Sequence, residues 1–196
     1  RTSRRQRQMC IRDRTNTATW YLNDTNGNGI QSPSSTASGD YSTAMGYNTT
    51  ASGNDSTAMG YNTTASGNDS TAMGKNTTAS GRASTAMGFY TMASGDYSTA
   101  MGNGTTASGS RSTAMGSGTV ASGNYSTAMG RITTASGSVS TAMGYYSTAS
   151  DFSSLVMGQF NLSGSTVTSS ADQFSLDNTA FVTVSYTHLR AHETSK

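Results

Sequence analysis

Residues that could perform acid–base or nucleophilic chemistry are few in this sequence and lie close to its two ends. The single cysteine, Cys10, is near the start, and the two histidines, His188 and His192, are near the end. A catalytic nucleophile needs a base within hydrogen-bonding distance and a third group that orients that base. The many serines between the ends recur with the period of a repeat, which indicates a requirement for small side chains. The sequence therefore predicts no enzyme and no cofactor.

One short stretch has the composition of a calcium-binding loop. Residues 24–29 read Asp-Thr-Asn-Gly-Asn-Gly, which matches the first half of the loop that binds calcium between two helices. The twelfth position is Ser35, whereas such loops need a bidentate Glu there, and no helical pattern flanks the stretch. We therefore expect an Asn/Gly turn that ends at Pro33, and no metal site.

The elements that must position any functional residue come from a repeat of fourteen residues, which runs from 35 to about 165 without insertions. Each copy, such as residues 51–64, has two halves of the form Ser/Thr-x-Ala-x-Gly-x-x. Small residues alternate with other types, which is the two-residue period of a β-strand. The two residues after each glycine are rich in turn-forming types. Each copy is predicted to form two short strands and two turns, with Ser42, Ala44 and Gly46 facing inward.

Such a unit cannot bury its own small-residue face, so successive copies must stack with equivalent strands paired one repeat apart. The predicted fold is all-β, a parallel β-solenoid of 14-residue coils. Its rungs would be about 4.8 Å apart, and its repeats would form a rod roughly 40 Å long. Because the inward residues are Ser, Thr, Ala and Gly, the two sheets must lie close together, and a single chain buries little apolar area.

A methionine recurs at one position of every copy, between the alanine and the glycine of the first strand. This position faces out of the coil, so the stacked methionines form a continuous apolar stripe. A stripe of this size usually marks an interface, and we interpret it as the surface that joins several chains around an axis. Its members are Met45, Met59, Met73, Met87, Met101, Met115, Met129, Met143 and Met157.

The variable turn residues form the second candidate surface. Exposed Tyr and Arg are enriched where proteins recognise partners, although the same variation would arise if nothing constrained the turns. Both interpretations stay open at this point. The residues singled out as possible ligand contacts are Tyr47, Tyr61, Lys75, Phe89, Tyr90, Tyr97, Arg111, Tyr125, Arg131, Tyr145 and Tyr146.

The succession Ser-Thr-Ala-Met-Gly and Thr-x-Ala-Ser-Gly resembles the head repeats of trimeric autotransporter adhesins, the YadA-like head. This resemblance covers residues 35 to about 165, and similar repeats occur in trimeric tail-fibre-like surface proteins. It implies a left-handed parallel β-roll, a homotrimer that is joined through the larger residues of the Ser-x-Ala-x-Gly strand, and a place at the cell surface, in bacteria the outer membrane. The sequence departs from the usual family repeat by having Thr and Met where Val and Ile are common.

Four further segments flank the repeats. Residues 15–34 are expected to cap the first coil, with the apolar cluster Trp20-Tyr21-Leu22 covering its open end. Residues 166–182 are expected to begin a following region. Residues 1–14 and 183–196 resemble translated sequencing adapters, so we expect both to be non-native and the chain to be a fragment whose anchor is missing.

The last copy of the repeat departs from the pattern of the others, which suggests a widening or a cap at this end of the roll. Asp151 replaces a glycine that is inward elsewhere, Val156 replaces an inward alanine, and Leu155 replaces a threonine.

Composition excludes some partners and leaves three classes of function. Residues 15–182 hold eight aspartates against four basic residues, so the net charge of +2 comes from the ends and predicts no nucleic-acid binding. The first class is an adhesin or fibre head that binds extracellular matrix, cells or glycans. The second is a structural spacer of a surface or tail fibre. The third is an ice-binding solenoid, because Thr50-x-Ser52 and its equivalents make a hydroxyl ladder, which Met92, Val120 and Leu162 interrupt.

Overall fold

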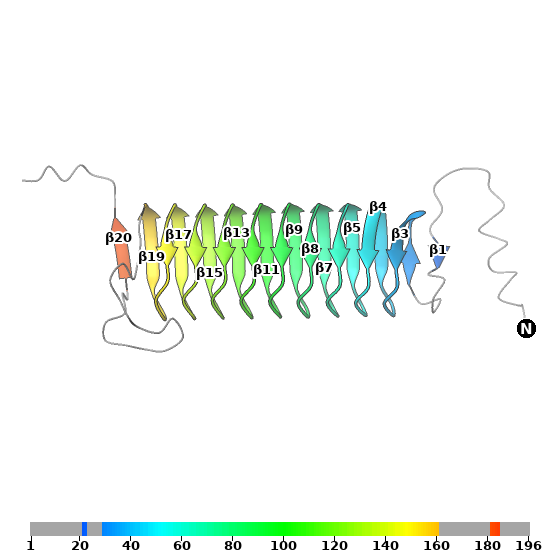
Figure 1. Cartoon of the computed structure of the whole chain (residues 1–196), viewed down its shortest axis with the longest axis horizontal. Coiled ribbons are helices and arrows are strands. Elements are labelled where there is room, and N and C mark those ends of the chain that lie inside the picture. Colours follow the sequence, from blue (N-terminus) through cyan, green and yellow to red (C-terminus); the bar gives the residue numbers. More distant parts are fainter. Residues whose placement is uncertain (1–20, 23–28, 161–180, 185–196) are drawn as a thin grey trace, which may run out of the picture.

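The computed structural model describes residues 21–22, 29–160 and 181–184, and its coils stack in chain order along one long axis (Figure 1). A regular coil has one strand of five residues and one of two residues, joined by two turns. Equivalent strands pair in parallel with a shift of one repeat, as Met87 does with Met101. The predicted parallel β-solenoid with a repeat of about fourteen residues is therefore confirmed.

The longer strands form one layer, which we call the Met sheet because each regular strand carries a methionine. It begins in β4 (Thr43–Ala51), which continues into the other layer and so links the two. The remaining strands of the Met sheet are β5 (Thr57–Tyr61), β7 (Thr71–Lys75), β9 (Thr85–Phe89), β11 (Thr99–Asn103), β13 (Thr113–Ser117), β15 (Thr127–Arg131), β17 (Thr141–Tyr145) and β19 (Leu155–Gln159).

The shorter strands form the opposite layer, which we call the Thr sheet because threonine dominates its outward face. Here Thr64 pairs with Thr78, one coil further along the stack. The strands that follow β4 in the Thr sheet are β6 (Thr64–Ala65), β8 (Thr78–Ala79), β10 (Met92–Ala93), β12 (Thr106–Ala107), β14 (Val120–Ala121), β16 (Thr134–Ala135) and β18 (Thr148–Ala149).

Short strands extend both ends of the stack. At the start, β1 (Tyr21–Leu22) pairs antiparallel with β2 (Ile30–Gln31), while β2 and β3 (Ser34–Ala37) each pair in parallel with β4. At the other end, β20 (Phe181–Val184) pairs in parallel with β19, placing Leu155 beside Phe181. Backbone from the predicted capping segment therefore joins the stack, whereas Trp20 and residues 24–28 of the calcium-like stretch lie outside the described residues.

Backbone hydrogen bonds join each coil to the next in the strands and also in the turns. In the Thr sheet, the Thr64 N–H donates to the Thr77 carbonyl at 2.9 Å. In the turns, the Asn62 N–H donates to the Tyr47 carbonyl at 2.9 Å, and the Asp69 N–H to the Asn54 carbonyl at 2.8 Å. The strand N–H groups donate to the following coil and these turn N–H groups donate to the preceding one, so the turns as well as the strands are held in register with their neighbours.

The core is narrow and is built from the smallest side chains, as the sequence predicts. Its buried apolar residues, among those described, are one column of alanines on each sheet and Val156 in the last coil. Serines of the Met sheet and threonines of the Thr sheet, such as Ser56 and Thr63, complete it and are fully buried. Because alanine has only a methyl group, this core removes little apolar surface from water.

The buried hydroxyl groups have few partners. Thirteen of them, running from Thr49 to Thr133, have no hydrogen-bond partner. Near the ends of the stack the same positions are satisfied, since the Ser42 hydroxyl donates to the Gly39 carbonyl at 2.7 Å and the Ser154 hydroxyl to the Asp151 carbonyl at 2.9 Å. A buried polar group without a partner costs about 1–3 kcal/mol. The interior of the stack therefore stabilises a single chain poorly.

One part of the predicted alternation is wrong. Gly46 and its equivalents do not face the core but are exposed, and their φ angles lie between 117° and 128°. L-residues with a side chain rarely adopt this conformation. In addition, a Cβ atom added at Gly88 would lie 2.1 Å from the carbonyl oxygen of Gly102 in the next coil. The glycine is retained for its backbone conformation and for the close approach of coils, not for an inward position.

The second glycine of each repeat is buried, as predicted, and is also required by the closeness of the coils. A Cβ atom at Gly53 would lie 2.0 Å from the Gly67 carbonyl oxygen. Asp151 occupies this position in the last coil and is buried, and the equivalent position one repeat later lies outside the described residues. Val156, in the same coil, fills the alanine position and is fully buried.

The thin core makes a prediction about two matched substitutions. Ala86→Leu places a large side chain between Ala72 and Ala100, which are its register neighbours and are completely buried. Overpacking of this kind typically costs about 1–3 kcal/mol, so the denaturation midpoint should fall. Thr64→Leu, at a half-buried outward position of the Thr sheet, should change it far less. Equal losses of stability in the two variants would contradict the assignment of the two faces.

Candidate functional site

The turns form two continuous edges along the stack. We call the turns that follow the Met sheet the first edge and those that follow the Thr sheet the second edge. In every copy from Tyr41 to Phe160, the second residue of the turn has a φ between 51° and 64°, which is the left-handed region. The backbone of all these turns is therefore the same, and only their side chains differ.

This backbone restricts which residues fit the second turn position. Asn, Asp and Gly tolerate the left-handed region well, whereas it is strained for bulky or β-branched residues. Gly104 and Asn62 fit this requirement, but Ile132 and Val139 do not. Aromatic residues also stand there against the backbone preference, at Tyr41, Tyr90, Tyr97, Tyr125, Tyr146 and Phe160.

These departures bear on whether the turns vary freely. A position that was merely unconstrained in function would still be constrained by its backbone toward Asn, Asp and Gly. Strained residues that persist at exposed positions motivate a hypothesis of function. Five exposed tyrosines at such positions favour recognition over drift, with exposures from 42% at Tyr146 to 69% at Tyr41.

Basic side chains on these edges lie over aromatic rings one coil away. On the first edge, the Lys75 Nζ lies 5.5 Å from the ring centre of Tyr61 and 5.6 Å from that of Phe89. Arg131 lies 5.4 Å from the ring centre of Tyr145. These distances are within the range of cation–π attraction. The cations are thus held in place by aromatic neighbours instead of extending freely into solvent.

The second edge carries an alternating row of arginine and tyrosine. Arg82 lies 4.9 Å from the ring centre of Tyr97, and Arg111 lies 5.2 Å from the ring centres of both Tyr97 and Tyr125. The Arg111 Nη1 also donates to the Tyr125 hydroxyl at 2.8 Å. This arrangement presents guanidinium edges and phenol groups in one line, and it could bind an anionic group.

Aromatic residues also gather on the first edge. Tyr47 and Tyr61 are stacked with ring centres 5.3 Å apart, and Phe89 meets Tyr90 edge-on at 4.4 Å. Toward the end of the stack, Tyr145, Tyr146 and Phe160 contact one another with ring centres 4.6 to 5.4 Å apart. Of the predicted ligand contacts, all are exposed except Tyr145, which is half-buried.

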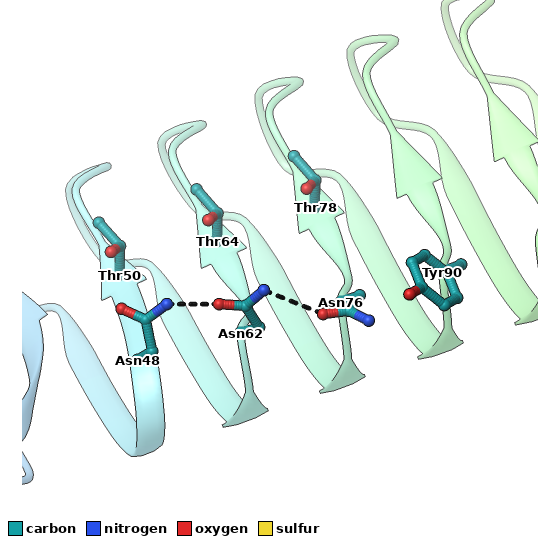
Figure 2. Close-up of a pocket in the computed structure, with 7 residues that line it drawn as sticks. All are labelled: Asn48, Thr50, Asn62, Thr64, Asn76, Thr78 and Tyr90. Carbon is teal, nitrogen blue, oxygen red and sulfur yellow. Dashed lines mark hydrogen bonds between the residues drawn. The ribbon is translucent and has the colours of Figure 1, made fainter.

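A shallow groove runs between the first edge and the outward face of the Thr sheet. Figure 2 shows a row of asparagines along it, with a threonine above each and an aromatic ring at one end. The Asn48 amide donates to the Asn62 Oδ1, and the Asn62 amide donates to the Asn76 Oδ1 at 3.0 Å. The groove is lined by Asn48, Thr50, Asn62, Thr64, Asn76, Thr78 and Tyr90.

The predicted methionine stripe exists as a geometric feature. Each methionine pairs in register with the next, as Met59 does with Met73, on the outward face of the Met sheet. The side chains are half-buried within one chain, and Met157 in the last coil is 37% exposed. The stripe is a continuous apolar surface on the side of the coil opposite the threonines.

The outward hydroxyl ladder of the Thr sheet is also present. Thr64 and its equivalents are half-buried, and Ser66 and its equivalents are mostly exposed. Met92, which is 46% exposed, and Val120 interrupt the threonine row within the described coils, while Leu162 lies outside the described residues. The ladder is therefore continuous only over short runs of coils.

Sequence reasoning missed part of this surface. From the sequence alone, the asparagines are predicted only to form turns, and the threonines above them are predicted to face solvent. The signal that could have identified them is the recurrence of Asn at Asn48, Asn62 and Asn76 in three successive copies, ended by Tyr90. The sequence also did not identify Ile132 and Val139 as strained residues, because their left-handed conformation is known only from the backbone angles.

The described residues contain neither a metal-binding cluster of side chains nor a membrane-spanning helix. Within residues 21–22, 29–160 and 181–184 there is no cluster of three or more His, Cys, Asp or Glu side chains that could hold a metal. The described part of the chain also contains no helix with the length and apolar character needed to cross a membrane.

Comparison with known families gives one specific match. The profile of the YadA head domain repeat, which covers two copies of the repeat, matches residues 37–63, 51–77, 65–91, 79–105, 93–119, 107–131 and 121–147. Together these matches cover 37–147, which is more than half of the chain. No curated protein matches the sequence.

The left-handed turn position predicts an unusual direction for one substitution. Ile132→Asn should stabilise the protein by about 1 kcal/mol, because asparagine tolerates the left-handed region and a β-branched residue does not. The opposite kind of substitution, Asn62→Ile, should destabilise the protein by more than about 1 kcal/mol, since it also removes the side-chain hydrogen bonds to Asn48 and Asn76. Denaturant unfolding of both variants measures the two changes. A lower midpoint for Ile132→Asn would show that this turn does not impose the conformation described.

Proposed function

The chain belongs to the YadA head domain repeat family, and on this premise we propose that it binds extracellular matrix, cells or glycans through its variable turns as a homotrimer. Membership establishes an adhesin head module, exposed at a surface and without enzymatic activity. Beyond what family membership establishes, we propose the class of ligand, the trimer and a location at the outer membrane.

The observation that carries the proposed binding function is the occupancy of the strained turn position. Tyr97, Arg111 and Tyr125 each adopt the left-handed conformation, although Asn or Gly would fit it at lower free energy. All three are exposed, and Arg111 contacts the tyrosine of the coil on each side of it. Tyrosine and arginine are the residue types that dominate binding energy at protein surfaces. Their placement supports a recognition role for the second edge.

The proposed trimer rests on the apolar stripe and the weak core together. The Met sheet presents one half-buried methionine per coil, while the interior offers alanines and unpartnered hydroxyls. Complete burial of one methionine contributes about 1.5–3 kcal/mol relative to full exposure. Packing the stripes of several chains against one another would supply apolar burial that one chain lacks. Two stripes could also pack as a dimer, and family membership is what supports three chains.

A structural spacer is the second candidate function. Hydrogen bonds in both strands and turns make the stack continuous, which suits a stiff element that carries another domain. An ice-binding role finds less support, because Met92 and Val120 interrupt the hydroxyl ladder. A spacer needs no specific side chains on its turns. The two leading functions therefore differ in what happens when the strained residues are replaced.

The binding function predicts loss of adhesion without loss of stability. Replacing Tyr97, Arg111 and Tyr125 with Asn fits the turn backbone better, so the variant should unfold no more easily than the original protein. We expect beads coated with the original protein to adhere to at least one surface in a panel of matrix proteins and cultured cells. The triple variant should adhere at least about tenfold less, as removal of interface hot spots does.

The control for this experiment is Val139→Asn, which lies on the same edge beside Tyr125 but removes neither an aromatic ring nor a charge. It should leave adhesion unchanged. Adhesion that survives the triple substitution would refute a role for these turn residues. An original protein that adheres to nothing in the panel would favour the spacer.

The trimer predicts the effect of charges on the methionine stripe. Changing Met87, Met101 and Met115 together to Lys would place like charges around the proposed axis, where they repel and are poorly solvated. The variant should be monomeric and largely unfolded, because little apolar burial would remain. Analytical ultracentrifugation measures the oligomeric state, and circular dichroism measures the folding.

The matched control places three lysines on the opposite face of neighbouring coils, at Ser94, Ser108 and Ser122, which are exposed on the Thr sheet. This variant should stay trimeric and folded. If the original protein sediments as a folded monomer at micromolar concentration, both the interface and the trimer are wrong.

A further inference from the structure

We propose that the groove along Asn48, Asn62 and Asn76, closed at one end by Tyr90, is a binding site for neutral carbohydrate. This site lies on the first edge and is distinct from the arginine–tyrosine row of the second edge. It rests on the adhesin function proposed above, and it names one ligand class and the residues that contact it.

The asparagine row presents a directed series of amide groups. The amide of Asn48 donates to Asn62, and the amide of Asn62 donates to Asn76. Hydrogen bonds in such a chain polarise one another. Within the described coils, the Asn76 amide nitrogen donates no hydrogen bond to another residue. Figure 2 shows this nitrogen at the end of the row that faces Tyr90. The row thus ends in an amide donor that is available to a ligand.

Threonine hydroxyls form the second wall. Thr50, Thr64 and Thr78 lie in register on the outward face of the Thr sheet, one above each asparagine (Figure 2). A hydroxyl group both donates and accepts, and an amide offers two donors and an acceptor oxygen. Sugar hydroxyls have the same dual character. The methionine stripe lies on the opposite sheet, so association through that stripe would leave this wall accessible.

Tyr90 gives the groove its aromatic end. Asparagine at this position would continue the row and would fit the backbone, which has a φ of 53°. Tyrosine instead stands there with 59% of its surface exposed, braced edge-on by Phe89. An aromatic face packs well against the C–H groups of a sugar ring, because its π-system is electron-rich. An aromatic platform beside amide and hydroxyl groups is the combination that a carbohydrate requires.

The groove carries no charge, which favours a neutral ligand. None of its seven lining residues is ionisable near pH 7. Lys75 precedes Asn76, but its amine lies between the rings of Tyr61 and Phe89 and does not line the groove. An acidic or sulfated glycan would find its cations on the second edge instead, at Arg82 and Arg111.

The asparagine row is not required by the fold itself. Later coils of the same edge build the same turn with Gly104, Gly118 and Ile132 at the asparagine position. Their backbone φ angles, 63°, 64° and 53°, are close to the 59° of Asn62. The turns therefore stack without side-chain amides. A row of three amides that ends at an exposed ring is better explained by a ligand than by stacking alone.

The experiment applies the whole chain of residues 1–196 to an array of neutral oligosaccharides that end in glucose, galactose, mannose, fucose or N-acetylglucosamine, printed beside sulfated and sialylated ones. We expect binding to at least one neutral oligosaccharide. Tyr90→Asn should weaken that binding by about tenfold or more, as loss of a central aromatic contact does. The substitution fits the turn, so thermal unfolding should not become easier.

The matched control is Ile132→Asn on the same edge. Ile132 has the same φ of 53° as Tyr90, but it carries no aromatic ring and no asparagine row leads to it. The Ile132→Asn variant should bind the neutral oligosaccharide as the original protein does. Side-chain amide resonances of Asn62 and Asn76 should shift when the oligosaccharide is added.

Three results would overturn the proposed carbohydrate site: binding of sulfated or sialylated glycans alone, equal losses of binding in Tyr90→Asn and Ile132→Asn, or no binding to any neutral oligosaccharide. Adhesion to matrix proteins or cells that persists in any of these cases leaves the adhesin function intact. If the protein also fails to adhere to every matrix protein and cell tested, the proposed adhesin function is wrong as well.

Discussion

The close approach of successive coils is the constraint on which the other features of this protein depend. Backbone at Gly53 and Gly88 lies so near the next coil that an added Cβ would be only about 2 Å from a carbonyl oxygen. This contact fixes glycine twice in each repeat. The narrow coil, in turn, leaves the core positions with room only for alanine, serine and threonine. The period of the repeat, its composition and the thin interior of the coil all follow from the close approach of successive coils.

A core of this kind shifts the stabilising surface to the outside of the coil. The inward hydroxyls contribute little to the stability of the coil, because they bury no large apolar group and most of them have no hydrogen-bond partner. Backbone hydrogen bonds between coils set the geometry, but bonds that replace those to water contribute modestly to stability. The methionines are the large apolar groups that recur in every coil, and they face outward. Fold and assembly are therefore expected to be coupled, since the surface suited to stabilising the coil is the surface suited to joining chains.

Much of this could be predicted from the sequence, because a strict period converts one local pattern into a whole fold. Ala44, Thr49 and the methionine stripe lie where the alternation of small residues places them. The alternation failed at Gly46, where a positive φ turns the chain outward, and residue type alone does not distinguish such a glycine from a buried one. The groove was missed for a different reason. Asn48 and Asn62 are ordinary turn residues one at a time, and only stacking brings their amides into one row.

Stacking also changes how the variable residues should be interpreted. In an ordinary loop, variation indicates weak constraint, because the backbone can adjust to each side chain. Here the coils above and below fix the turn backbone, so every residue is measured against the same left-handed conformation. Asp55 and Asp69 satisfy it, and their presence requires no functional explanation. Tyr90, Tyr97 and Tyr125 oppose it at about 1–2 kcal/mol each, in a fold with little stability to spare. The turns that depart furthest from the backbone preference are therefore the first places to look for ligand contacts, on both edges of the stack.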